Sequence, residues 1–276
     1  MPKKKYPIEH WSYSSLITYL RNPLSWYKRY VEGIYDIPST PASVIGKAGH
    51  VALQYFYDGL SKEKATHFGL DYLKNVPDFE INFGKISSIR GIRNKRKKME
   101  NDYEQAINFY LQKPPKHKVL GTEVKGLSRI PGIPIPIKAI SDLVVLSRFD
   151  KKAVDIIDHK FVNNFNKHQS DNPLFMLQAL FNYYTVLKIF KKPVRGFIVY
   201  ECKKTKNRDG KSQLRRYYID FKKHQDEFRF FHELVSDATK DLLTRKKFLP
   251  NPTDMFEGKD SLEMYRLKLI DEEKLK

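Results

Sequence analysis

The 276-residue sequence contains a single cysteine, Cys202. One thiol cannot form an internal disulfide, and it cannot build a cysteine zinc site or a four-cysteine iron–sulfur cluster. Because Cys202 lies in the apolar run FIVYEC, we interpret it as a strand residue and not as a nucleophile. The histidines show no H-E-x-x-H motif, so the sequence does not predict a zinc protease site.

Long apolar runs are absent as well. No stretch of about eighteen apolar residues occurs, so no membrane-spanning helix is predicted. The basic start MPKKKYPIEHW is not followed by an apolar segment, unlike a secretory signal. Apolar residues still make up 41% of the chain, enough for a real core. We therefore expect an intracellular protein with a single domain over residues 1–276.

Acidic residues are few relative to basic ones. The chain has 51 Lys and Arg against 32 Asp and Glu, a formal net charge of +19. Such an excess favours a polyanionic partner, because phosphate contacts release counterions. A basic protein without such a partner would show the same excess, and charge alone indicates no chemistry.

The apolar pattern predicts helices first and strands later in the chain. We expect a helix from Ser14 or Ser15, a second turn after Pro23, and a helix around His50. A polar, Lys-rich segment at about 60–118 is predicted to be a basic helical insertion. The later elements are three strands (VLGTEVKGLSRI, IPIPIKAISDLVVLS and KAVDIIDHKFV), a helix opened by Asn172-Pro173, a strand–turn–strand bending at Asp209-Gly210, and a C-terminal helical segment at about 222–276. This order predicts an α/β fold around a central mixed β-sheet flanked by helices.

Two predicted neighbouring strands each carry an acidic residue among apolar ones, Asp142 in KAISDLVVL and Asp158 in VDIIDHKFV. Residues two apart on a strand share a face, so Lys160 should lie beside Asp158. Asp155 should point the other way. Glu123, on the preceding strand, is a third carboxylate that could reach the same place.

Buried carboxylates are costly unless they are paired or bind a cation. Oxygen ligands favour Mg²⁺ or Mn²⁺ over zinc. Such an ion polarises a phosphate and lowers the pKa of a bound water toward ~7. A lysine beside it can orient that water and balance developing charge. Two acids and a lysine are therefore the minimum set for metal-assisted phosphodiester hydrolysis.

An Asp-x-Lys tripeptide alone is usually a surface pair, but here it occurs in an ordered set of motifs. The others are S-x-S-x-L-x-x-Y at Ser12 to Tyr19, an aromatic pattern at Pro23 to Tyr30, G-x-x-x-H at Gly46 to His50, the lone acid Glu123, Ala139 to Asp142, Asp158 to Lys160, and a helix with Gln178. This order, over about residues 11 to 202, resembles the PD-(D/E)XK nucleases, in particular their RecB-like and AddAB-type branch.

The resemblance implies a restriction-endonuclease-like core and specific roles for the matching residues. Asp142, Asp158 and the main-chain carbonyl of His159 would bind the metal, with Glu123 a less certain ligand. Lys160 would be the catalytic lysine. His50 would be an extra metal ligand or a substrate contact. Gln178 would hold the phosphate backbone or orient Lys160.

The sequence departs from the family pattern in two places. Ala139 stands where the family has glycine. In the Q-x-x-x-Y motif the tyrosine position holds Asn182, and Tyr183 comes one residue later, about 100° further round the helix. Iron–sulfur members carry a cysteine where this chain has Asn22, so no iron–sulfur cluster is expected.

Two basic clusters are candidates for contacts to a nucleic-acid backbone. The usual reading of such runs is a solvated surface, but in a nuclease they would clamp phosphates. The candidate set is Arg90, Arg93, Lys95, Arg96, Lys97 and Lys98 in the helical insertion, and Lys203 and Lys204 after the core, together with Tyr183. The aromatics Tyr13, Trp26 and Tyr27 are interpreted as the inner face of the first helices, with base stacking as the alternative.

The implied function is a metal-dependent deoxyribonuclease, by resemblance an exonuclease for free ends or single strands. A structure-selective endonuclease and a non-catalytic nucleic-acid-binding module are the alternatives, and RNA as substrate stays open. The family serves DNA repair, recombination and phage replication. The chain carries no helicase motif, so a helicase or a recombination or replication protein would be a separate partner.

Overall fold

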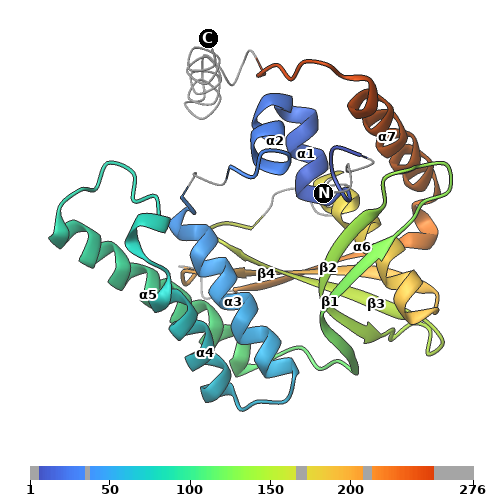
Figure 1. Cartoon of the computed structure of the whole chain (residues 1–276). Helices are drawn as coiled ribbons and strands as arrows, with labels where there is room; N and C mark the ends of the chain where they lie inside the picture. The colour runs from blue at the N-terminus through green and yellow to red at the C-terminus, as the bar shows by residue number, and fades with distance from the viewer. Residues whose placement is uncertain (1–5, 35–37, 166–172, 208–212, 252–276) are drawn as a thin grey trace, which may run out of the picture.

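The computed structural model describes residues 6–34, 38–165, 173–207 and 213–251. At its centre lies one five-stranded sheet in the order β1-β2-β3-β4-β5 (Figure 1). The strands are β1 (Val119–Ser128), β2 (Ile137–Leu146), β3 (Val154–Val162), β4 (Val194–Lys203) and β5 (Leu214–Asp220). β3 and β4 are parallel, and the other neighbours are antiparallel. The predicted mixed α/β fold is therefore confirmed.

The two N-terminal helices begin at side-chain caps. α1 (Tyr13–Arg21) starts after Ser12, whose hydroxyl accepts a hydrogen bond from the Ser15 N–H. α2 (Pro23–Tyr30) starts after Asn22, whose amide oxygen accepts from the Ser25 N–H. Both caps satisfy amides that a helix start leaves without partners. The two predicted helical segments are confirmed, with α1 beginning one residue before Ser14.

Three longer helices form one group beside the sheet. They are α3 (Pro41–Tyr57), α4 (Lys62–Asn75) and α5 (Ile89–Gln112), with the short 3₁₀ turn η1 (Asp78–Glu80) between the last two. Figure 1 shows α3, α4 and α5 together, with α6 and α7 on the other side of the molecule. The helices predicted within residues 60–118 are present. Whether they form an insertion into the fold stays a prediction.

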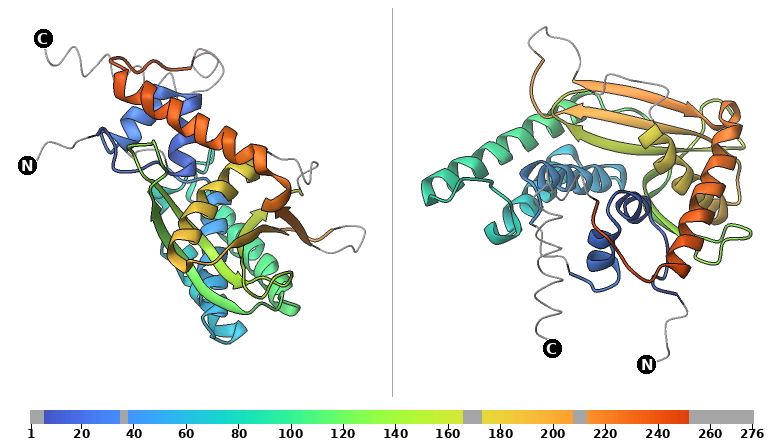
Figure 2. Two further views of the ribbon diagram at one scale, coloured as in Figure 1. Left: turned by 90° about the vertical axis from the view of Figure 1, so that its right-hand side faces the viewer. Right: turned by 90° about the horizontal axis from the view of Figure 1, so that it is seen from above.

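The parallel pair β3 and β4 is connected through α6 (Pro173–Phe190), the crossover helix that parallel strands require. The turn η2 (Phe221–Lys223) and α7 (Gln225–Thr244) complete the described chain. Figure 2 shows α7 running along the outside of α6. The predicted cap Asn172, the bend at Asp209-Gly210 and the final segment lie outside the described residues. No helix in the described part combines the length and apolar character needed to cross a membrane.

Each face of the sheet has its own apolar core. On one face, alternate strand residues such as Val154 and Ile156 pack with α1, α2, α6 and α7. On the other face, Ile157 and Ile198 pack with α3, α4 and α5. Helices on both faces explain why β3 and β4 are almost continuously buried.

The middle of the sheet splits at one point. The β2–β3 ladder pairs Leu146 with Val154 and ends at the pair Leu143 and Ile157. Beyond that pair β2 stays with β1, whereas β3 stays with β4 as far as Val162. Asp142 is the first residue of β2, and Asp158 the first of β3, past the last pair. The two predicted acids therefore stand at the fork between two diverging strands.

Candidate active site

Where β2 and β3 separate, the Asp142 side chain takes the place of a main-chain carbonyl as the acceptor for a β3 amide. Its Oδ2 accepts a hydrogen bond of 2.7 Å from the His159 N–H. A charged acceptor makes a strong hydrogen bond to a backbone amide. The side chain of Asp142 is thus held in place by β3, although the residue belongs to β2.

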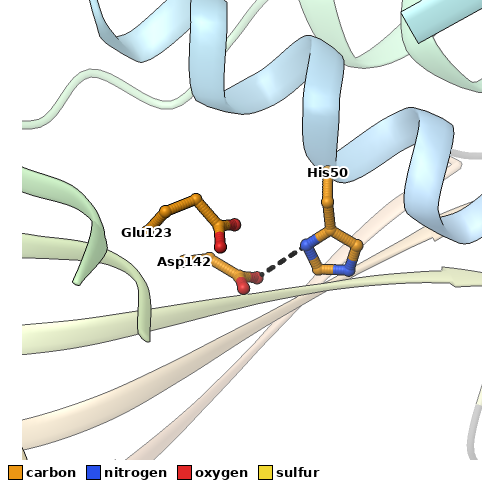
Figure 3. Close-up of side chains that lie close together, drawn as sticks. All are labelled: His50, Glu123 and Asp142. Atoms are coloured by element: carbon orange, nitrogen blue, oxygen red, sulfur yellow. Dashed lines mark ion pairs between the residues drawn. The ribbon is translucent and has the colours of Figure 1, made fainter. Parts of the chain in front are cut away.

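His50 and Glu123 approach Asp142 from two other elements (Figure 3). The Nδ1 atom of His50, on α3, lies 3.2 Å from Asp142 Oδ2. Glu123 comes from β1, where its φ of 44° lies in the left-handed region, which is uncommon for a residue other than glycine. One ligand atom from each of the three side chains lies within 4.8 Å of the others. This geometry could hold a metal ion.

The charges of this group are not balanced. Burial alone would lower the pKa of His50, but the Asp142 carboxylate raises it to about 9. Burial would raise the pKa of Asp142, but His50 and His159 hold it well below its usual range. Burial and the Asp142 charge both raise the pKa of Glu123. Two acids facing one imidazole leave a site that favours an added cation.

Asp158 makes a different set of contacts. The Lys160 Nζ lies 2.8 Å from Asp158 Oδ2, which confirms that the two side chains share a face. The Gln178 amide, from α6, donates to Asp158 Oδ1 at 2.6 Å and accepts from Lys160 Nζ at 3.0 Å. These three residues form a closed ring of contacts. Among the described residues, Asp158 is not one of the three side chains whose ligand atoms lie within 4.8 Å of one another.

The lysine in this ring is held in its charged form. Burial alone would lower the pKa of Lys160, but the pairing with Asp158 raises it. Burial raises the pKa of Asp158, Lys160 opposes this, and the Asp142 charge adds to it. An ammonium group is therefore fixed beside the carboxylate cluster.

The His159 side chain is 2% exposed, and its Nδ1 lies 3.5 Å from Asp142 Oδ2, the oxygen that also accepts from the His159 N–H. Its Nε2 lies 2.9 Å from the Tyr110 hydroxyl, which lies 2.8 Å from the Tyr57 hydroxyl. Tyr57 in turn donates to the Pro115 carbonyl. A buried chain of hydrogen bonds thus supports the residue whose N–H holds Asp142. Spacing along the chain did not predict these contacts, because Tyr57 and Tyr110 lie on α3 and α5, far from His159 in the sequence.

Comparison with known protein families shows which superfamily the chain belongs to. The model of the PD-(D/E)XK nuclease superfamily matches residues 10–255, which is most of the chain. The chain belongs to this superfamily. No curated protein matches the sequence significantly.

Solved structures add only weak similarities to the superfamily match. The crystal structure of SSO0001 is 14% identical with a TM-score of 0.29, covering 85% of each chain. An alkaline exonuclease from Laribacter hongkongensis is 12% identical with a TM-score of 0.32, covering 75% of this chain and 90% of its own. Membership of the PD-(D/E)XK superfamily rests on the sequence match, and the RecB-like branch stays a prediction.

The departure in the superfamily's Q-x-x-x-Y motif has a structural consequence. Asn182, four residues after Gln178, donates from Nδ2 to the Gln178 carbonyl and accepts at Oδ1 from the Ser141 hydroxyl. Tyr183 instead packs against Phe221 and Phe228, with ring centroids 4.9 and 4.7 Å away. Asn182 therefore takes the position beside the site, as its i+4 spacing from Gln178 would predict.

The predicted phosphate-binding residues fall into two groups. Arg90, Arg93, Lys97 and Lys98 are exposed on α5, and Lys95 is partly exposed. Lys98 pairs with Asp102. Arg96 instead joins α5 to the preceding segment, because its guanidinium contacts Asp78 and the carbonyls of Leu73 and Val76. A fixed structural role for Arg96 was not visible in the sequence.

The two lysines of the second basic cluster differ in exposure. Lys203 lies over the Phe165 ring, 5.7 Å from its centroid. Lys204 is only 3% exposed, and burial lowers its pKa. A buried side chain of this kind cannot reach a DNA backbone in this arrangement, so we omit Lys204 from the proposed contacts.

Asp155 and Cys202 lie away from the site, as predicted. Asp155 lines a separate cavity with His117 and Tyr200. Cys202 is buried in β4, and burial raises the pKa of its thiol to about 12. Asp155 and Cys202 are therefore both assigned to the structure of the sheet and not to the candidate site.

Proposed function

We propose that this chain is a metal-dependent deoxyribonuclease that hydrolyses DNA phosphodiester bonds, as a RecB-like exonuclease on free ends or single strands. The observation that carries the proposal is the pairing of two groups at the strand fork. One is the cluster of Asp142, Glu123 and His50, and the other is the ring of Asp158, Lys160 and Gln178.

The donors of the cluster fit a hard divalent cation. Carboxylate oxygens with one imidazole suit Mg²⁺ or Mn²⁺. Asp142 and Glu123 would hold the ion, with His50 as a further ligand after it loses its proton. Asp158 and the His159 carbonyl are proposed as additional ligands. When bound, such an ion supplies Lewis-acid polarisation of the phosphate and a more acidic water.

The protein's own residues then provide position and charge. Lys160 cannot swing freely, because Asp158 and Gln178 both hold its ammonium group. A preorganised positive charge stabilises negative charge that develops on a phosphate without reorganising during the reaction. Asp142 is fixed in the same way by the His159 N–H.

The net charge of +19 supports a nucleic acid as the substrate. The exposed cations of α5 and Lys203 are the proposed backbone contacts, and DNA rather than RNA follows from the family resemblance. A helicase or recombination protein would act as a separate chain.

The test is cleavage of end-labelled single- and double-stranded DNA by wild type and Lys160→Ala, with Mg²⁺, Mn²⁺ or EDTA. We expect wild type to cut only with metal, and the folded variant to bind DNA with cleavage reduced by about 10²–10³-fold. Labelled mononucleotides as the product would support an exonuclease. Labelled fragments cut at internal positions would support an endonuclease. Binding without cleavage by wild type under every condition would support a non-catalytic module instead.

A further inference from the structure

A second feature of the site is a cavity that the proposed chemistry does not use. Its volume is about 310 Å³, at the lower end of the range for small-molecule sites. Tyr13 of α1, Ala139 and Ile140 of β2, and Gln178 and Asn182 of α6 contribute to its lining. Because Gln178 also contacts Asp158 and Lys160, the cavity borders the catalytic ring directly.

We propose that this cavity is a stacking subsite for one unpaired nucleobase next to the scissile phosphate, with the Tyr13 ring as its platform. The proposal rests on the proposed nuclease function and names its substrate as single-stranded DNA. A tyrosine ring offers a flat apolar face, and every base can stack on such a face.

The position of Tyr13 separates it from the other aromatics of the N-terminal helices. Trp26 is fully buried, with no exposed surface. Tyr27 stacks on Phe248 at 4.5 Å between ring centroids. Tyr13 is only partly buried and lines the cavity. Tyr13 shares this cavity with Gln178, whose amide contacts both Asp158 and Lys160.

Hydrogen bonds within the protein hold the two amides that line the cavity. Asn182 already uses its amide on Ser141 and on the Gln178 carbonyl. Gln178 uses its amide on Asp158 and Lys160. These hydrogen bonds fix the orientation of both amides beside the Tyr13 ring.

A phosphate has a separate place at the same cavity. Lys138 lines it and supplies a positive charge. His10 also lines it, but burial and the Lys138 charge lower the His10 pKa, so Lys138 is the cation. A base against Tyr13 with its phosphate toward Lys138 matches the chemistry of a single strand, in which charged and flat groups alternate.

The test compares an oligothymidine with an oligonucleotide of the same length that carries tetrahydrofuran in place of every base. Affinity is measured without metal by fluorescence anisotropy, and KM is measured separately with Mg²⁺. The variants are Tyr13→Leu, which keeps apolar bulk, and Tyr13→Phe, which keeps the ring. Tyr27→Leu is the matched control, since Tyr27 lies on the neighbouring helix α2 and does not line the cavity.

We expect Tyr13→Leu to weaken oligothymidine binding about tenfold, whereas Tyr13→Phe and Tyr27→Leu bind like wild type. Replacing the bases with tetrahydrofuran should weaken DNA binding by a larger factor in the wild type than in Tyr13→Leu. Only the wild type has a stacking contact with Tyr13 to lose. An equal loss in both proteins would overturn the subsite. If wild type bound but never cut, the nuclease proposal would fail while the anisotropy result still decided the subsite.

Discussion

Asp142 and Asp158 stand on neighbouring strands at one fork, yet their surroundings differ in kind. Asp142 faces a second carboxylate, Glu123, and an imidazole, His50. Asp158 faces an ammonium, Lys160, and an amide, Gln178. The first half of the site sets two carboxylates against one protonated imidazole, whereas the second half sets one carboxylate against an ammonium group.

This difference suggests a division of labour between the two halves. The Asp142 half is arranged to gain a cation from solution, whereas the Asp158 half holds a built-in cation in a fixed place. Because the supports also differ, each half can be disturbed separately. Asp142 depends on β3, α3 and α5, and Lys160 depends on its own strand and α6.

The largest expected effect separates metal binding from catalysis. Asp142→Asn should abolish Mn²⁺ binding and lower the cleavage rate by about 10³-fold, because the cluster loses its central charge. Lys160→Ala should lower cleavage by about 10²–10³-fold while Mn²⁺ still binds. Calorimetry with Mn²⁺ and single-turnover cleavage would check both. Equal loss of Mn²⁺ affinity in the two variants would contradict separate halves.

The buried chain behind Asp142 should matter for metal affinity. Tyr110→Phe removes the hydroxyl between His159 and Tyr57, so the Mg²⁺ concentration for half-maximal cleavage should rise about tenfold. Tyr103→Phe is the control on the same helix, because its hydroxyl contacts the Thr66 carbonyl instead. The same Mg²⁺ dependence for both variants would show that the chain does not position Asp142.

The packing of α4 on α3, the helix that carries His50, can be loosened by a substitution outside the site. A Cβ added at Gly69 would clash with the Tyr103 hydroxyl of α5 and lie 2.5 Å from the Ala48 carbonyl oxygen of α3, so Gly69→Ala must push α4 away from these two helices. We expect its free energy of unfolding in urea to fall by about 1–3 kcal/mol. Gly46→Ala, in open space on α3, is the control and should be neutral or stabilise by up to about 1 kcal/mol. Similar values for the two variants would mean that α3 and α4 are not closely packed.

The smallest expected effect concerns pH. Burial, with nearby cations, lowers the pKa of His117 to about 4 from 6.5. The unfolded chain therefore binds the extra proton first, and this histidine reduces stability as pH falls from 6.5 toward 4. Between pH 6.5 and 4, the free energy of unfolding should fall less steeply with falling pH for His117→Asn than for wild type, by at most about 1.4 kcal/mol per pH unit. Thermal unfolding at several pH values in this range would measure the difference. An unchanged slope would show that His117 does not titrate in this window.

Much of the core was predictable because its signals are local. Strand periodicity alone places Asp158 and Lys160 on one face, and apolar runs alone mark β1 to β4. Helix caps such as Ser12 are also local, since the hydroxyl and the amide that it accepts from are three residues apart.

Other features depended on which distant segments meet. Arg96 and Lys97 look alike in a basic run, but the contacts of Arg96 to residues about twenty positions away make it a structural residue. Lys204 reads as a surface cation and is buried. A charge run has the same sequence whether it is solvated or fixed.

The sequence by itself determined the types and order of the candidate site residues and the strands that carry Asp142, Asp158 and Lys160, because these follow from spacing along the chain. Only the tertiary structure decided the partners that come from other elements: His50 and Glu123 for Asp142, and Gln178 for the Asp158–Lys160 pair. The physical reason is the fork between β2 and β3, since strand divergence depends on how helices pack on both faces of the sheet and leaves no pattern within one strand.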